Sequence, residues 1–120
     1  MLFTSTLACA AALGAVCRYA TSVWMQQYQS TSLGGTLLAN VLGSLGAGLV
    51  AGAALSGWLP PDWHLVLSTG FLGAYTTFST YMVESAALLR ERNLRTLLLY
   101  VLGSTLLGTA AAALGLALML

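Results

Sequence analysis

The chain contains no lysine, and charged residues of either sign are scarce. Four arginines and three acidic residues are spread over 120 positions, so 6% of the residues are charged, against about 25% in an ordinary soluble domain. Four scattered arginines cannot form the basic stripe that phosphate neutralisation requires, which excludes nucleic-acid binding. A net charge of +1 with 58% hydrophobic residues also excludes disorder, since disordered chains combine high charge with low hydrophobicity.

The sequence also lacks the residue sets from which enzymes are built. It has no Ser-His-Asp combination, no paired carboxylates inside an apolar run and no glycine-rich phosphate loop. Its two cysteines, Cys9 and Cys17, are separated by about 12 Å along a helix, which is too far for an intrachain disulfide. We expect no enzymatic activity, and we expect both cysteines to pack as small apolar residues.

Long apolar runs dominate the chain instead. A membrane-spanning helix needs about 20 apolar residues, whereas a barrel strand needs about 10 with strict alternation. The runs here are long and do not alternate, which predicts an all-α integral membrane protein with a single transmembrane domain over residues 1–120. The four expected helices cover roughly 2–25, 33–55, 64–88 and 97–119.

Residues near the predicted span ends suit the membrane surface. Aromatic side chains of the kind that anchor in lipid headgroups fall there: Trp24, Tyr28, Trp58 and Trp63. The third connection holds Arg90, Arg92 and Arg95, whereas the second has no basic residue other than His64. The positive-inside rule therefore predicts the third loop in the cytoplasm and both termini outside.

Small residues recur every four positions inside two of the spans. Gly48 and Gly52 share one face of the second helix, and Ser104, Gly108 and Ala112 share one face of the fourth. Such faces let helix backbones approach closely. Four short helices enclose little volume, so we expect an oligomer.

The third span is unusually polar at its middle. Five hydroxyl residues occupy six positions over 76–81, close to Gly70 and Gly73. Glycines permit a break in the helix, and a break frees backbone carbonyls that must meet protein, water or a cation. Alternatively, the hydroxyls bond back to the preceding turn and hold helices together.

Polar residues also line one face of the second and fourth helices. Thr36, Asn40 and Ser44 are spaced by four, as are Tyr100 and Ser104. Unpaired, a buried Asn carboxamide costs a few kcal/mol. Neutral donors and aromatic ring edges in series suit a small anion, so the pattern indicates a narrow permeation path. The alternative is hydrogen bonding between helices.

Two ionisable residues lie nearest to the span interiors, Arg18 and Glu84. Charges inside the membrane are functional candidates by default. Each is also close enough to a predicted span end to reach the headgroups, so both interpretations stay open.

Three segments together resemble the CrcB (Fluc) family of fluoride channels. They are Gly14-Ala15-Val16-Cys17-Arg18-Tyr19, the run 34–43 from Gly34 to Gly43, and Gly70-Phe71-Leu72-Gly73-Ala74-Tyr75-Thr76-Thr77-Phe78-Ser79-Thr80-Tyr81 followed by Glu84. The resemblance covers essentially the whole chain, in order, and the Thr-Thr-Phe-Ser-Thr run is its most specific part.

The resemblance implies a four-helix subunit with a broken third helix that pairs antiparallel with a second copy, in dual topology. Each dimer would have two fluoride pores and a central structural sodium ion (Na+), held by backbone oxygens that map to Gly73 and Thr76. Such proteins sit in the inner (plasma) membrane and let fluoride leave the cell passively, which relieves its toxicity.

The resemblance also assigns roles to individual residues. The pore asparagine maps to Asn40, the pore aromatics to Phe78 and Tyr81, the hydroxyl track to Ser79, Thr80 and Ser104, and the pore-facing tyrosine to Tyr100. The vestibule arginine maps to Arg18, and we place the motif glutamate, Glu84, beside it in the vestibule.

The chain departs from the family pattern in two ways. Tyr81 stands where the family usually has Phe. Its ring edge can still face fluoride, and the added hydroxyl can bind the ion directly or change conduction. The arginine bias of the third loop suits a fixed orientation, so a heteropair with an opposite-facing paralogue competes with the homodimer that we expect.

Two rival functions remain. One is a proton-driven exporter of organic cations, which needs a carboxylate at mid-bilayer, and Glu84 lies near the end of its predicted span. The other is a non-transporting membrane assembly subunit.

Overall fold

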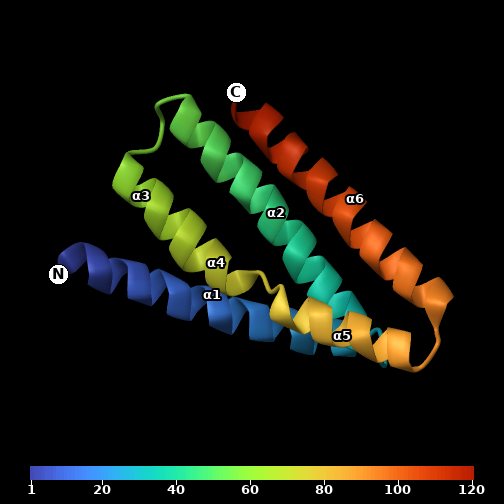
Figure 1. Ribbon diagram of the computed structural model, residues 1–120. Coiled ribbons are helices and arrows are strands. Elements are labelled where there is room, and N and C mark those ends of the chain that lie inside the picture. Colours follow the sequence, from blue (N-terminus) through green and yellow to red (C-terminus); the bar gives the residue numbers. More distant parts are fainter.

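The computed structural model describes residues 1–120 and contains helices but no strands. Three helices are uninterrupted: α1 (Leu2–Gln26), α2 (Leu33–Leu55) and α6 (Leu94–Met119). Each is long and apolar enough to cross a membrane. The remaining crossing, which is the third in chain order, is assembled from shorter pieces. The predicted all-α, multi-pass membrane fold is therefore confirmed (Figure 1).

The third crossing is broken, as the glycines and hydroxyls near its middle predict. It consists of α3 (Pro61–Leu65), the π-helix η1 (Val66–Leu72), α4 (Gly73–Tyr75) and α5 (Ser79–Arg90). Residues 76–78 between α4 and α5 are not helical. The π-helical stretch is a feature that the sequence pattern does not predict.

Two helices begin earlier than expected. The third crossing starts at Pro61 rather than at residue 64, because proline is well suited to the first helical position, where no N–H is needed. Helix α6 starts at Leu94 rather than at residue 97, because the side chain of Asn93 caps it and accepts a hydrogen bond from the Thr96 N–H at 3.4 Å.

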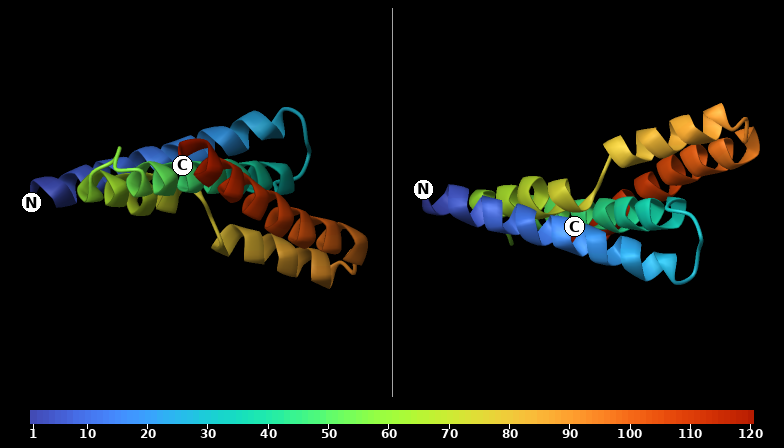
Figure 2. Two further views of the ribbon diagram at one scale, coloured as in Figure 1. Left: turned by 90° about the horizontal axis from the view of Figure 1, so that it is seen from above. Right: turned by 90° about the horizontal axis from the view of Figure 1, so that it is seen from below.

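The connections alternate between the two ends of the molecule. Figure 1 shows the α2–α3 loop and both termini towards one end, and the α1–α2 loop and the α5–α6 turn at the other. The views in Figure 2 show that α5 and the first half of α6 stand away from α1 and α2. The break therefore redirects the third crossing from α1 towards α6.

Glycines bring α2 and α6 into close contact. A Cβ atom at Gly48 would overlap the carbonyl oxygen of Ala112, and one at Gly115 would overlap that of Leu45. No larger residue fits at either position, so these two backbones touch as the small-residue spacing predicts.

Few side chains are buried within one chain. Only 15 of 120 residues are buried, and large apolar side chains are exposed on every long helix. In a membrane protein such a surface faces lipid or another subunit.

Candidate functional site at the break in the third crossing

The site is centred on the backbone of the break. Thr76 is extended, with φ −83° and ψ 161°, and ends α4. The N–H of Thr77, which in a continuous helix would bond the carbonyl of Gly73, instead donates to Asn40 Oδ1 at 2.8 Å. The carbonyl of Gly73 is therefore left without its helical partner.

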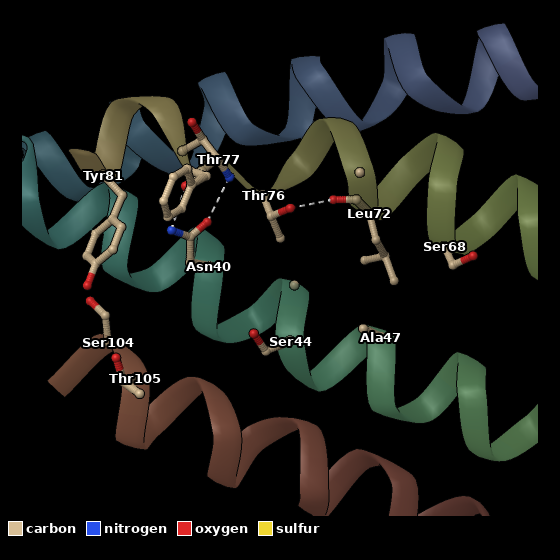
Figure 3. Close-up of a pocket in the computed structure, with 13 residues that line it drawn as sticks. Asn40, Ser44, Ala47, Ser68, Leu72, Thr76, Thr77, Tyr81, Ser104 and Thr105 are labelled. Carbon is tan, nitrogen blue, oxygen red and sulfur yellow. Dashed lines mark hydrogen bonds between the residues drawn. The ribbon is translucent and has the colours of Figure 1, made fainter. Parts of the chain in front are cut away.

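Asn40 pairs with both polar groups of one residue. Its Nδ2 donates to the carbonyl of Thr77 at 2.9 Å, while its Oδ1 accepts from the N–H of the same residue. Figure 3 shows this pair of bonds between α2 and the break. One N–H of the carboxamide remains for another acceptor.

Arg18 reaches the same segment from α1. Its Nη1 donates to the carbonyl of Thr76 at 3.3 Å, and the side chain is partly buried. The guanidinium thus lies against the break.

A cavity of about 450 Å³ opens beside the break (Figure 3). It lies between α2, the third crossing and α6, and it contains no charged side chain. Its lining residues are Asn40, Gly43, Ser44, Ala47, Ser68, Leu72, Gly73, Thr76, Thr77, Phe78, Tyr81, Ser104 and Thr105.

One hydroxyl in this cavity has no partner. Ser104 Oγ is buried and makes no hydrogen bond. Leaving such a group unpaired costs about 1–3 kcal/mol. Such a hydroxyl in the wall of a cavity is a candidate donor to a molecule or ion that enters the cavity.

A second polar cluster surrounds Glu84. Ser32 and Thr36 donate to its two carboxylate oxygens at 2.7 and 2.6 Å, and Tyr100 Oη donates at 3.4 Å. Glu84 is 9% exposed, so its carboxylate is held inside the protein by α2 and α6. Within this chain the carboxylate therefore points inward, towards these three hydroxyls.

Aromatic rings connect the two clusters. The ring centroids of Phe78 and Tyr81 are 6.2 Å apart, and those of Tyr81 and Tyr100 are 5.2 Å apart. Phe78 lines the cavity and yet is 73% exposed, so one chain covers only part of this ring.

The structure brings together some of the predicted site residues and separates others. Asn40, Phe78, Tyr81 and Ser104 line the cavity, as do the expected cation ligands Gly73 and Thr76. Tyr100 lies in the Glu84 cluster. The two remaining hydroxyl-track residues, Ser79 and Thr80, are exposed at the start of α5 and lie outside the cavity wall of this chain.

One role was missed by sequence reasoning. Ser32 occupies the N-cap of α2, but its hydroxyl bonds Glu84 instead of the helix. Its spacing of four from Thr36 was a usable signal. Thr76, for which bonding back to the preceding turn was the alternative, does bond the Leu72 carbonyl, at 2.9 Å (Figure 3).

Comparison with known proteins identifies the family to which this chain is similar. The model of the family described as CrcB-like protein, Camphor Resistance (CrcB), matches residues 5–116. A relative from Leifsonia xyli named "Fluoride-specific ion channel FluC 1" is 42% identical over 116 residues, 96% of this chain and 85% of the relative.

Two further relatives carry similar names. One from Rhodococcus jostii, "Fluoride-specific ion channel FluC 2", is 44% identical over 87% of this chain and 87% of its own length. One from Methylobacterium nodulans, "Fluoride-specific ion channel FluC", is 36% identical over 98% of this chain and 95% of its own length.

Proposed function

This chain belongs to the CrcB family, and from that premise we propose that it forms a passive channel through which fluoride leaves the cell. Its relatives are named ion channels, so it is a transport protein and not an enzyme. The channel would lie in the plasma membrane, the inner membrane of a bacterium, where it relieves fluoride toxicity.

The observation that carries the proposal is the unpartnered hydroxyl of Ser104 in a cavity without fixed charge. A hydroxyl and the free N–H of Asn40 can donate to a small anion, and ring edges of Phe78 and Tyr81 present positive charge to it. Neutral donors bind an anion weakly enough to release it, as conduction requires.

The Glu84 cluster extends the proposed path beyond the cavity. Thr36 lies one helical turn before Asn40 on the same face of α2, and Tyr100 one turn before Ser104 on α6. The hydroxyls of Thr36 and Tyr100 bond the carboxylate of Glu84 in this structure. For an anion to pass here, these hydroxyls would turn from the carboxylate to the ion.

A dimer is the second part of the proposal. Phe78 is largely uncovered and the cavity opens at the surface of one chain, so a second copy would close it. Antiparallel pairing would place two such pores side by side. We expect a homodimer. The competing partner is an opposite-facing paralogue, because three arginines lie together at one end of the molecule, at the end of α5, in the α5–α6 turn and at the start of α6.

The central sodium ion is the third part. The carbonyl of Gly73 has lost its helical donor, and that of Thr76 accepts one bond from Arg18, which leaves it a second lone pair. Both residues line the cavity and fit a cation that prefers oxygen ligands. One chain offers only these two oxygens, so the second copy would have to supply the rest. When bound, the ion would neutralise carbonyl dipoles at the dimer centre.

Efflux from liposomes tests the proposal. Purified chain is reconstituted in vesicles loaded with fluoride, with matched chloride-loaded and protein-free vesicles beside them. We expect rapid fluoride release without chloride release, and no dependence on a proton gradient. Organic-cation transport coupled to protons would favour the exporter, and a folded chain that moves no ion, alone or with an opposite-facing paralogue, would favour an assembly subunit.

Two serine variants sharpen the test. Ser104→Ala should lower fluoride release about ten- to a hundredfold, because one hydrogen bond to an ion contributes about 1.5–3 kcal/mol. Ser5→Ala is the matched control, since Ser5 is exposed and bonds only the Met1 carbonyl.

A further inference from the structure

The backbone of the break is held from two sides by two different helices. Arg18 of α1 bonds the carbonyl of Thr76, and Asn40 of α2 bonds both the N–H and the carbonyl of Thr77. Three successive polar groups of the non-helical backbone are thus partnered by two side chains. No other side chain bonds the backbone polar groups of these two residues.

The position of Arg18 is fixed by its neighbours on α1. Gly14, one turn earlier on the same face, lies so close to the third crossing that a Cβ there would overlap the carbonyl oxygen of Phe71. Thr21, one turn later, shares a hydrogen bond of 3.0 Å with Tyr75 Oη. This face of α1 therefore packs against the third crossing on both sides of Arg18, and Arg18 lies beside the break.

A charged donor suits this carbonyl. An extended residue in the middle of a membrane span has no helical partner for its carbonyl, and an unpartnered carbonyl in apolar surroundings costs several kcal/mol. Hydrogen bonds from an ionised donor are about twice as strong as neutral ones. The guanidinium makes no hydrogen bond to any other residue of this chain.

We propose that Arg18 is a positioning residue, which with Asn40 fixes the backbone of residues 76–77 and thereby sets where Phe78 and the free carbonyl of Gly73 lie. This role deepens the proposed channel function and rests on it. It differs from gathering anions at a vestibule, because the charge acts on a carbonyl of the protein and not on the approaching ion.

The two roles separate in the concentration dependence of flux. Removing an anion-gathering charge raises the fluoride concentration at half-maximal flux, and the effect weakens with added salt because the charge is screened. Removing a positioning residue lowers the maximal flux and leaves the half-maximal concentration unchanged, at any salt concentration.

The experiment compares Arg18→Ala and Arg18→Lys with the control Arg95→Ala, an exposed arginine far from the break in the sequence. Fluoride flux is measured over a concentration series at low and high salt. Amide hydrogen exchange is followed at Thr77, whose N–H is bonded to Asn40 Oδ1. The exchange measurement needs no conduction, so it decides on the role of Arg18 even if the channel function fails.

For Arg18→Ala we expect maximal flux to fall about tenfold at an unchanged half-maximal concentration, and exchange at Thr77 to rise about tenfold. Arg18→Lys keeps the charge but loses the planar fork, so it should recover both readouts only in part. Arg95→Ala should match the parent chain.

Two results would overturn the proposal. One is unchanged exchange at the break in Arg18→Ala. The other is full activity in Arg18→Lys together with a salt-dependent rise of the half-maximal concentration in Arg18→Ala. If the alanine variant does not fold, the lysine variant alone decides, since a charge-only role predicts that it equals the parent in flux and exchange.

Discussion

The hydroxyl of Thr36 donates to Glu84 Oε1 at 2.6 Å, and this bond joins α2 to α5 at a buried point 48 residues apart in the chain. Ser32 bonds the other carboxylate oxygen one turn earlier on α2. The second half of the broken crossing is therefore attached to α2 through one carboxylate. Asn40 attaches the break itself to the same helix face.

Thr36→Val should destabilise the protein by about 2 kcal/mol. The substitution replaces the hydroxyl by a methyl group of similar volume, so the buried carboxylate of Glu84 loses one hydrogen-bond donor. Thermal unfolding in detergent measures the change. Thr109→Val is the control, since Thr109 is exposed in α6 and makes no side-chain hydrogen bond. Equal unfolding midpoints for the two variants would mean that the Thr36 bond contributes nothing to stability.

Gly48→Ala should destabilise the contact between α2 and α6 by about 1–3 kcal/mol, because the added methyl group would overlap the carbonyl oxygen of Ala112. Gly103→Ala is the matched control on α6: nothing lies within 4 Å of the added atom there, and alanine favours helix. The control should unfold at the parent temperature or above it. A tolerated Gly48→Ala would show that α2 and α6 can move apart freely.

Local chemistry was sufficient to predict the break. Glycines and hydroxyls around residues 70–81 weaken a helix in apolar surroundings, and the carboxamide of Asn40 needed polar partners wherever it lay. Both requirements are met at one place, since Asn40 bonds Thr77. These features depend on residue type and depth in the membrane, which a sequence contains.

The position of Glu84 was not predictable in the same way. Its surroundings depend on the direction that α5 takes after the break, because its partners Ser32, Thr36 and Tyr100 belong to α2 and α6. The π-helix η1 has no local signal either. The sequence therefore predicted the polar stripe of α2 and the break, whereas tertiary contacts decided that Glu84 meets Ser32 and Tyr100 and that Ser79 and Thr80 stay exposed.

Arg92→Gly should stabilise the protein by about 1 kcal/mol. Arg92 has φ 57°, the only non-glycine residue with positive φ, at the end of α5, where its N–H bonds the Leu89 carbonyl and the N–H of Asn93 bonds that of Leu88. Glycine adopts this conformation without the cost that a side chain brings.

The matched control for this prediction is Arg92→Ala, which removes the charge and keeps the backbone cost. Thermal unfolding of both variants separates the two effects. The glycine variant should unfold at the higher temperature. If both variants shifted equally, the change would come from the charge of Arg92 and not from its backbone.

Tyr81→Phe should leave both stability and fluoride selectivity nearly unchanged in the proposed channel. The Tyr81 hydroxyl is 3.5 Å from the Val101 carbonyl oxygen, a distance too long for a strong bond, whereas its ring packs against those of Phe78 and Tyr100. The ring position is thus set by aromatic contacts that phenylalanine keeps. We expect fluoride flux within about twofold of the parent and continued exclusion of chloride, measured in paired liposome assays with the exposed Tyr19→Phe as control. A tenfold loss of fluoride flux confined to Tyr81→Phe would instead indicate that the hydroxyl binds the ion directly. The role of Tyr81 would then depend on its hydroxyl as well as on its ring.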